Sequence, residues 1–386
     1  MFRYSKSLTG KILLLLIIIA IMLSAGGCVG FGGQQTGWSG VAVADGMLFF
    51  GSNEGELVAL DNENGSQLWP PVSFETSSSG GFGCAAQSTA VAIYGTPAID
   101  GELVYIGCFD GKVRAINVET GAIRWIYPRE GSIHTMIGGP VVAQGKVFIG
   151  SVGGIVYALD AATGDFIWQF EAGGEIWSTP SIAGDTLFIG SFNKNLYALD
   201  IATGEEKWQQ SFETQGSIVS TPLVYENTVY IASFDRHIYA LDATSGEKIW
   251  QYPAENETEN KPKKWFWASP VIHNNTIYAP NMDGKIYVLD TADSGASITI
   301  INLESAISSS PVVAGDKIFI ATEDGNLYYI DTSNNQAIQL PDLEGGVSAP
   351  FTTGDGIVYV HTYKDEIVYA ISAETGEVRK LWKPSQ

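Results

Sequence analysis

A repeated segment of 39 to 48 residues runs through nearly the whole chain and most constrains its fold. The stretches that begin at Gly145, Gly184 and Glu226 align with one another almost without gaps. One further unit, from Trp38 to Trp69, precedes the first proline of the series, which makes eight units. The prolines that open the other seven units are Pro97, Pro140, Pro180, Pro222, Pro270, Pro311 and Pro350.

Each unit has the pattern of four short strands. A β-branched and aromatic run such as TLFIGS is followed by an alternating run such as LYALD, and then by a strand that carries Trp. Asp-Gly pairs such as Asp110-Gly111 suit tight hairpin turns, and D-x-x-T-G corners such as Asp160–Gly164 suit turns with a left-handed glycine. Periods near 40 residues with four strands each are typical of propeller blades, whereas the repeats of β-solenoids are shorter. The sequence therefore predicts an all-β, eight-bladed β-propeller of four-stranded antiparallel blades over residues 38–386.

The N-terminus has the features of an export signal. Arg3, Lys6 and Lys11 precede an unbroken apolar stretch of twelve residues, Ile12–Leu23, which is shorter than the ~20 residues that a membrane-spanning helix needs. Small residues and Cys28 follow, so residues 1–27 are interpreted as a lipoprotein-type signal peptide and 28–37 as a short tether. The segment Ala25–Cys28 resembles a bacterial lipobox, in which Cys28 would be lipidated, although such signals usually carry Leu where this chain has Ala25. An ordinary cleaved signal or an uncleaved anchor are the alternatives, and each places the propeller outside the cytoplasm.

The charge balance excludes some classes of partner. The chain has 21 Lys and Arg against 42 Asp and Glu, and three of the basic residues lie in the signal peptide. Because nucleic-acid binding depends on phosphate neutralisation, this excess of acidic residues argues against it, and equally against broad contact with an anionic membrane. The expected partners are a protein of the cell envelope and, through the lipid, a membrane. The propeller by itself is expected to be a monomer.

Cys84 and Cys108 remain after the signal is removed. In an oxidising compartment such a pair is a disulfide candidate, and neither residue belongs to a Cys-x-x-Cys or Cys/His cluster of the kind that holds a metal. We therefore expect no metal site, and we predict pairing of Cys84 with Cys108.

Tryptophan recurs at one position of the repeat, four residues after the turn glycine. A ladder of indoles on a surface would suggest carbohydrate binding, but repetition at one blade position favours packing between neighbouring sheets, where the indole N–H finds a single partner. The residues concerned are Trp69, Trp125, Trp168, Trp208 and Trp250, with Trp382 displaced by two residues.

The repeat, represented by GSFNKNLYALDIATGEEKW, resembles the pyrroloquinoline-quinone (PQQ) repeat over nearly all of residues 38–382. The resemblance implies the propeller fold strongly and the cofactor weakly, because the repeated residues serve turns and blade packing. Two kinds of protein share it: quinoprotein dehydrogenases, which hold PQQ and Ca²⁺ on the propeller axis, and non-catalytic propellers similar to the lipoprotein of the outer-membrane β-barrel assembly machinery.

The chain lacks the residues that the dehydrogenase alternative requires. Those enzymes stack the quinone on a disulfide between adjacent cysteines, and this chain has no adjacent cysteine pair. Its four histidines share no motif, and most of its isolated Asp residues fall at turn positions of the repeat. We therefore predict no catalytic residue and no cofactor. PQQ and Ca²⁺ would be expected only if the dehydrogenase alternative were correct. A surface propeller that binds glycans or peptides is a third hypothesis.

The candidate binding residues lie where the repeat is interrupted, because loops on a rigid scaffold often carry function. Three long connections join the last strand of one blade to the first of the next and should emerge on one face: residues 70–93, 126–138 and 253–267. The last combines a basic island with aromatic residues, as interface hot spots do. The predicted partner-binding residues are Phe74, Phe82, Arg129, His134, Lys261, Lys263, Lys264, Trp265 and Phe266.

Overall fold

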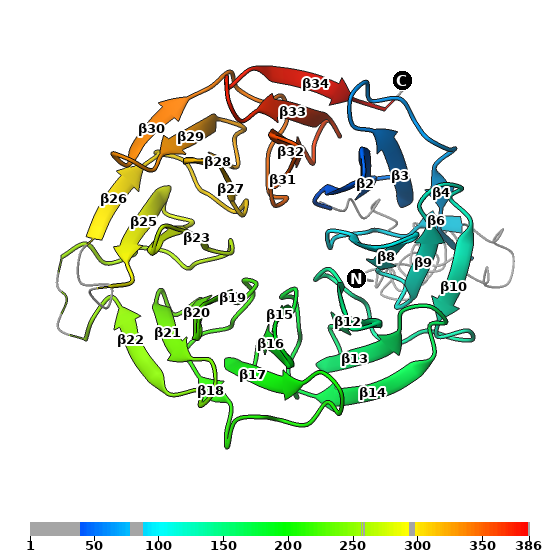
Figure 1. The fold of residues 1–386 in the computed structure, drawn as a ribbon, viewed down its shortest axis with the longest axis horizontal. Helices are drawn as coiled ribbons and strands as arrows, with labels where there is room; N and C mark the ends of the chain where they lie inside the picture. Colours follow the sequence, from blue (N-terminus) through cyan, green and yellow to red (C-terminus); the bar gives the residue numbers. More distant parts are fainter. Residues whose placement is uncertain (1–38, 78–87, 256, 258, 293–297, 385–386) are drawn as a thin grey trace, which may run out of the picture.

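Eight four-stranded antiparallel sheets are arranged in a ring around a central axis (Figure 1). The computed structural model describes residues 39–77, 88–255, 257, 259–292 and 298–384. Within each sheet the strands follow one another in chain order, from the innermost at the axis to the outermost at the rim. The predicted eight-bladed propeller is therefore confirmed. In the described part of the chain there is no helix that is long and apolar enough to cross a membrane.

The strands of the first four blades match the repeat. They are β1 (Ala42–Ala44), β2 (Met47–Gly51), β3 (Glu56–Asp61) and β4 (Val72–Ser73); β7 (Ala98–Asp100), β8 (Leu103–Gly107), β9 (Val113–Asn117) and β10 (Ile123–Tyr127); β11 (Val141–Ala143), β12 (Lys146–Gly150), β13 (Ile155–Asp160) and β14 (Phe166–Glu171); β15 (Ser181–Ala183), β16 (Thr186–Gly190), β17 (Asn195–Asp200) and β18 (Phe212–Glu213).

The last four blades repeat the same order. They are β19 (Leu223–Tyr225), β20 (Thr228–Ala232), β21 (Ile238–Asp242) and β22 (Lys248–Tyr252); β23 (Val271–His273), β24 (Thr276–Pro280), β25 (Lys285–Asp290) and β26 (Ile298–Asn302); β27 (Val312–Ala314), β28 (Lys317–Ala321), β29 (Leu327–Asp331) and β30 (Gln336–Gln339); β31 (Thr352–Gly354), β32 (Ile357–His361), β33 (Val368–Ser372) and β34 (Val378–Trp382).

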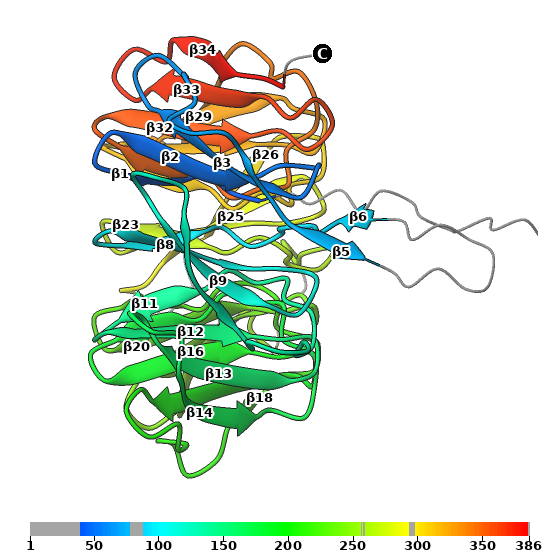
Figure 2. The same cartoon turned by 90° about the vertical axis from the view of Figure 1, so that its right-hand side faces the viewer.

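The connection 70–93 contains more structure than a plain loop. It includes the outermost strand of blade one, β4, and then a separate two-stranded hairpin of β5 (Glu75–Ser77) and β6 (Ser88–Ala90). Figure 2 shows this hairpin projecting from one side of the disc. It is not part of the repeat, so the period that predicts the blades gives no signal for it.

The hydrophobic core is divided into eight clusters, one between each pair of neighbouring blades. The cluster between blades three and four, for example, joins Phe148 and Trp168 of one sheet to Leu187 and Leu199 of the next. Strands β2, β3 and their counterparts are buried on both faces, which explains their nearly continuous apolar sequences.

The repeated tryptophans pack between blades, as predicted. The five that keep the regular spacing are each no more than 9% exposed, Trp382 is partly buried, and four of the five donate the indole N–H to a backbone carbonyl of the next blade. The ring of each of these four covers the corner glycine of the next blade, at Gly121, Gly164, Gly204 and Gly246. The donor and acceptor pairs are Trp69 to Val118 (3.0 Å), Trp125 to Ala161 (2.9 Å), Trp168 to Ile201 (3.3 Å) and Trp208 to Ala243 (3.0 Å).

The ring closes between blades eight and one without exchanging a strand. Both sheets are complete, and a core cluster containing Phe50 and Tyr359 lies between them. Across the same seam, the ring of His361 lies 4.8 Å from that of Phe50, and its Nδ1 is 3.1 Å from the carbonyl oxygen of Ser39. The seam therefore contains a buried imidazole.

We expect His361 to make ring stability depend on pH. Burial lowers the pKa of His361 from 6.5 to about 4, although the hydrogen bond to Ser39 opposes this shift. The unfolded chain takes up a proton below its pKa of about 6.5, whereas the folded chain does so only near 4, so stability falls as the pH drops through this window. Between pH 7.5 and pH 5, His361 should account for a loss on the order of 2 kcal/mol, measurable by urea unfolding.

A variant separates this effect from other acid-sensitive groups. His361→Gln should show a smaller loss of unfolding free energy over the same pH range than the wild type. His134→Gln, at an exposed position, is the matched control and should keep the wild-type slope. Identical slopes for all three proteins would contradict the assignment to His361.

Candidate functional site at the axial mouth

The connections between blades meet at one end of the propeller axis, which we call the axial mouth. In seven blades, the connection from the preceding blade accepts a backbone hydrogen bond from the turn between the second and third strands. Val152 donates to Thr135 (2.8 Å), for example, and Met282 donates to Trp265 (3.3 Å). These repeated bonds place the ends of the three long connections, at Ala92, Thr135 and Trp265, on one face, as predicted.

Side chains alternate in direction as each connection approaches its inner strand. In the connection to blade six, Trp265 is exposed, Phe266 is completely buried, and Trp267 lines a cavity on the axis. Because successive residues of an extended chain point in opposite directions, the same order recurs around the ring. The buried position is held in other blades by Ile93, Met136, Ile176, Ile218, Ile307 and Val347.

The axial cavity has a volume of about 110 Å³. Every blade connection contributes to its lining, through residues such as Tyr94, Trp177, Val219 and Ser308. The lining contains no Asp or Glu, so it does not offer the carboxylate that the PQQ resemblance implies for a Ca²⁺ ion. Among the described residues, no group of three or more His, Cys, Asp or Glu has the arrangement of a metal site.

Five aromatic rings form a continuous surface beside the axial mouth, over blades four to six, which we call the mouth aromatic surface. Its members are Trp177, Phe192, Phe234, Trp265 and Trp267. Phe234 lies at its centre, with ring centroids 5.8 Å from Trp267, 6.1 Å from Trp265 and 6.3 Å from Phe192. Trp177 extends the surface by contacts with Phe192 at 4.8 Å and Trp267 at 6.2 Å.

Trp265 is the member that blade packing explains least. It is 45% exposed, whereas the repeated tryptophans of the outer strands are buried. Other blades have Ala92, Thr135 or Ala306 at the position of Trp265, so the repeat does not require a large ring there. An aromatic side chain held in place by a rigid scaffold and left exposed is a characteristic of interface anchors.

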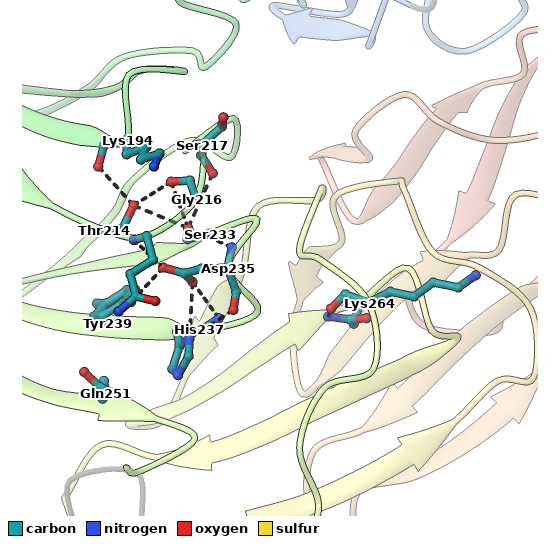
Figure 3. A network of polar contacts seen from close by, with 12 residues as sticks. Lys194, Thr214, Gly216, Ser217, Ser233, Asp235, His237, Tyr239, Gln251 and Lys264 are labelled. Carbon is teal, nitrogen blue, oxygen red and sulfur yellow. Dashed lines mark hydrogen bonds and ion pairs between the residues drawn. The ribbon is translucent and has the colours of Figure 1, made fainter.

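A polar network fixes the turn that presents Phe234 (Figure 3). The carboxylate of Asp235 accepts hydrogen bonds from the backbone N–H of His237 at 3.0 Å, the hydroxyl of Tyr239 at 2.8 Å and the backbone N–H of Gln215 at 2.8 Å. Burial alone would raise the pKa of Asp235, but hydrogen bonds from the ring of His237, the hydroxyl of Tyr239 and the backbone of Gln215 outweigh it and hold that pKa below its ordinary value. The network explains how a polar turn can hold an aromatic ring in a defined position.

Two of the predicted binding residues are buried and therefore need correction. Phe266 occupies the buried position of its connection, where the other blades have an aliphatic residue. Phe74 is 4% exposed and its ring stacks under the guanidinium of Arg114, with 4.5 Å from Cζ to the ring centroid. Both rings fill the space between blades and are not available as surface contacts.

The predicted basic residues lie on the surface. Lys261, Lys263 and Lys264 are exposed, and the backbone of their loop is fixed because the N–H of Lys263 donates to Asp283 at 3.0 Å. Arg129 is also exposed and pairs with Asp165 at 2.8 Å. The prediction that these residues bind a partner stays a prediction.

The remaining predicted residues have mixed outcomes. His134 is exposed and its ring covers Gly153 in the neighbouring turn. Cys108 is buried, and burial raises the pKa of its thiol to about 12. Cys28, Phe82 and Cys84 lie outside the described residues, so lipidation of Cys28 and pairing of Cys84 with Cys108 stay predictions.

The sequence contains a signal for the residues that were not predicted. Phe192, Phe234 and Met282 each lie two residues after the end of the second strand of a blade, in runs such as IGSFNK and IASFDR. Polar turns seldom need a large apolar residue, so an aromatic side chain at this position indicates a surface role. The sequence alone does not place this position beside the blade connections. The backbone hydrogen bonds between the turns and the connections do.

Comparisons with known proteins give one family and several similar folds. The family model described as outer membrane protein assembly factor BamB matches residues 36–154 and 152–382. The crystal structure of BamB from Moraxella catarrhalis is 18% identical, with a TM-score of 0.69, covering 86% of this chain and 95% of that one. No curated protein matched the chain in sequence.

Two other solved structures have a similar fold. The computationally designed Ika8 protein is 16% identical, with a TM-score of 0.67, covering 92% of this chain and 98% of that one. Sqt1 from Saccharomyces cerevisiae is 17% identical, with a TM-score of 0.62, covering 73% of this chain and 83% of that one. At these identities the structural likeness shows the fold alone.

Proposed function

Since the chain belongs to the family of the outer membrane protein assembly factor BamB, we propose that it is a propeller scaffold that binds another protein in the cell envelope. In this proposal it acts without catalysis and without a cofactor, during the assembly of envelope or outer-membrane proteins. The family match over almost all of the propeller carries the proposal, and the mouth aromatic surface supports it.

The proposal includes the location of the protein. A lipid on Cys28 would hold a monomeric propeller at a membrane, on the side outside the cytoplasm. The signal-like segment 1–27 and the cysteine that follows it support this part. A single lipid chain anchors only weakly, so stable attachment would need a second chain or a membrane-bound partner.

The mouth aromatic surface is the proposed contact with the partner. Its rings are held by contacts with one another and by the turn network around Asp235, so little conformational entropy is lost on binding. Rigid aromatic side chains at the centre of a surface supply much of the binding energy in protein complexes. Trp265, the most exposed of the five, is the residue at which a probe should meet the partner.

Site-specific photocrosslinking in intact cells tests the proposal. A photoreactive phenylalanine analogue at position 265 should give a reproducible crosslink to one envelope protein. The same analogue at position 249 is the matched control, because Ile249 is also large, apolar and 53% exposed but lies on the outer strand β22. A probe at position 265 would lie within the proposed contact, whereas one at position 249 would not. We therefore expect the crosslink yield at position 265 to be at least about fivefold higher.

The result can contradict either part of the proposal. Equal yields at positions 265 and 249, or no crosslink at 265, would remove the mouth aromatic surface as the contact. Mass spectrometry of the N-terminal fragment of the protein from the membrane fraction tests the anchor, and Cys28 should carry acyl groups. An unmodified Cys28 in that fragment, or a fragment that begins elsewhere, would contradict lipid attachment.

A further inference from the structure

A small pocket opens at the end of the mouth aromatic surface, and we call it the Glu323 pocket. It has a volume of about 210 Å³ and is lined by Trp265, Trp267, Met282, Ser308, Glu323 and Ser348. Pockets that enclose drug-sized ligands have volumes of about 300–1,000 Å³, so this one suits a single side chain. Three successive blade connections and two neighbouring turns contribute to it, so its shape depends on the propeller ring rather than on one loop.

Glu323 is the only ionisable group in this lining. Its backbone is fixed by the hydrogen bond from its N–H to the carbonyl of Ala306 at 2.8 Å, and its side chain is half-buried. Within the described ranges its carboxylate has neither a hydrogen bond nor an ion pair, whereas the Ser308 and Ser348 hydroxyls bond to each other at 3.2 Å. A partly buried carboxylate among apolar groups gains from a cationic partner, because its desolvation is otherwise uncompensated.

The two indole rings favour the same kind of occupant. A guanidinium or ammonium group over the face of Trp is attracted by the negative charge density of the ring, and the attraction is stronger where water is excluded. The alkyl stem of an Arg or Lys side chain would pack against Met282 while its charged end reaches the carboxylate. The net charge of −21 also attracts basic segments before contact is made.

Other occupants match the pocket less well. A sugar ring can stack on indole, but recognition of its hydroxyls needs several polar groups, and here the two serine hydroxyls already bond to each other. An acidic segment would meet Glu323. Lys261, Lys263 and Lys264 precede Trp265 along the chain, but none of them lines the pocket.

We propose that the Glu323 pocket binds one Arg or Lys side chain of an extended segment of the protein partner. The inference rests on the proposed function, since it names the chemistry of the partner at the same surface. Glu323 would supply the ion pair, and Trp265 and Trp267 would supply the aromatic faces. The partner segment would then cross the mouth aromatic surface with one basic residue as its anchor.

The test uses short peptides and the full mature chain. Acetylated, amidated Gly-Gly-X-Gly-Gly peptides differ only at X, which is Arg, Lys, citrulline or Leu, and binding is followed by calorimetry and indole fluorescence. Citrulline has nearly the shape of arginine without its charge. We expect the Arg peptide to bind at least about tenfold more tightly than the citrulline peptide, as a charge-assisted bond with cation–π contact implies.

Variants assign the preference to the pocket. Glu323→Gln should abolish the difference between Arg and citrulline, and Trp265→Ala should weaken the binding of Arg and Lys. Glu54→Gln is the matched control: Glu54 is exposed, lies in the corresponding turn of blade one, and is outside the pocket. It should bind the Arg peptide as the wild type does.

Three outcomes would overturn the inference. These are equal binding of the Arg and citrulline peptides, a Glu323→Gln variant with an unchanged preference, and tight binding of a β-1,4-linked N-acetylglucosamine trisaccharide in place of the peptides. Its failure is distinguishable from failure of the proposed function. A crosslink at position 265 together with an inert Glu323→Gln substitution would leave the scaffold proposal intact and remove only the basic anchor.

Discussion

Replacing Trp168 by alanine should lower the free energy of unfolding by about 3–5 kcal/mol, the range for removing a buried aromatic side chain. The indole is 7% exposed, belongs to the core cluster between blades three and four, and lies 5.7 Å from the ring of Phe148. Its N–H donates to the carbonyl of Ile201 at 3.3 Å. The substitution therefore leaves both a cavity and an unpaired carbonyl at the interface between two sheets.

Two further variants identify the cause of this loss. Trp168→Phe keeps most of the apolar volume and loses the hydrogen bond, so it should cost less than Trp168→Ala. Trp265→Ala is the matched control, because it removes the same side chain from a 45% exposed position, and it should change stability by less than about 1 kcal/mol. Urea unfolding of the three variants measures the comparison. Similar losses for Trp168→Ala and Trp265→Ala would mean that the repeated tryptophans do not hold the blades together.

The structural role of a residue in this protein can be predicted from the sequence where the residue recurs at one position of the repeat. Trp125 and Trp168 recur with the period, so their packing role follows from that recurrence, and the indole bonds to Ala161 and Ile201 confirm it. The charged residues that precede the aromatic run predict Phe266 as a surface contact. Its place in the connection instead matches that of Ile176, which is the buried position.

Some features of the site do not follow from a one-dimensional pattern. Phe192, Phe234 and Trp267 come from different blades, and their contact depends on the curvature of the ring around its axis. The same holds for the pocket in which Glu323 meets Trp265, since the two residues are far apart in sequence. The hairpin of β5 and β6 is also unpredictable from the period, because no second copy of it is found in the part of the chain that the structure describes.

The mouth aromatic surface and the blade interfaces use aromatic side chains for different purposes. At the interfaces, rings such as Trp208 are buried against a glycine of the next blade and satisfy one polar atom. At the mouth, Trp265 and Trp267 contact other rings and line the entrance of a pocket. A folded ring is therefore required to assemble the surface, whereas loss of the surface should leave the ring intact. This asymmetry allows binding to be tested in variants that remain folded.

Removing the carboxylate of Asp110 should be about as costly as removing a core tryptophan. Asp110 and Arg114 form an ion pair whose side chains are only 4% and 7% exposed, with Arg114 Nη1 3.0 Å from Asp110 Oδ1. The guanidinium lies against the ring of Phe74, away from water. Asp110→Ala would leave this charge buried without its partner, and breaking a buried pair in this way costs about 3–5 kcal/mol.

The double variant Asp110→Ala with Arg114→Met shows whether the cost comes from the uncompensated charge. With both charges removed and an apolar stem left against Phe74, the loss of unfolding free energy should be smaller than in Asp110→Ala alone. Asp165→Ala breaks the exposed pair with Arg129, whose side chains are 64% and 78% exposed, and should cost less than about 1 kcal/mol. Thermal and urea unfolding provide the measurement. A double variant less stable than Asp110→Ala would mean that Arg114 stabilises blade two even without Asp110. The loss in Asp110→Ala would then not come from an uncompensated buried charge.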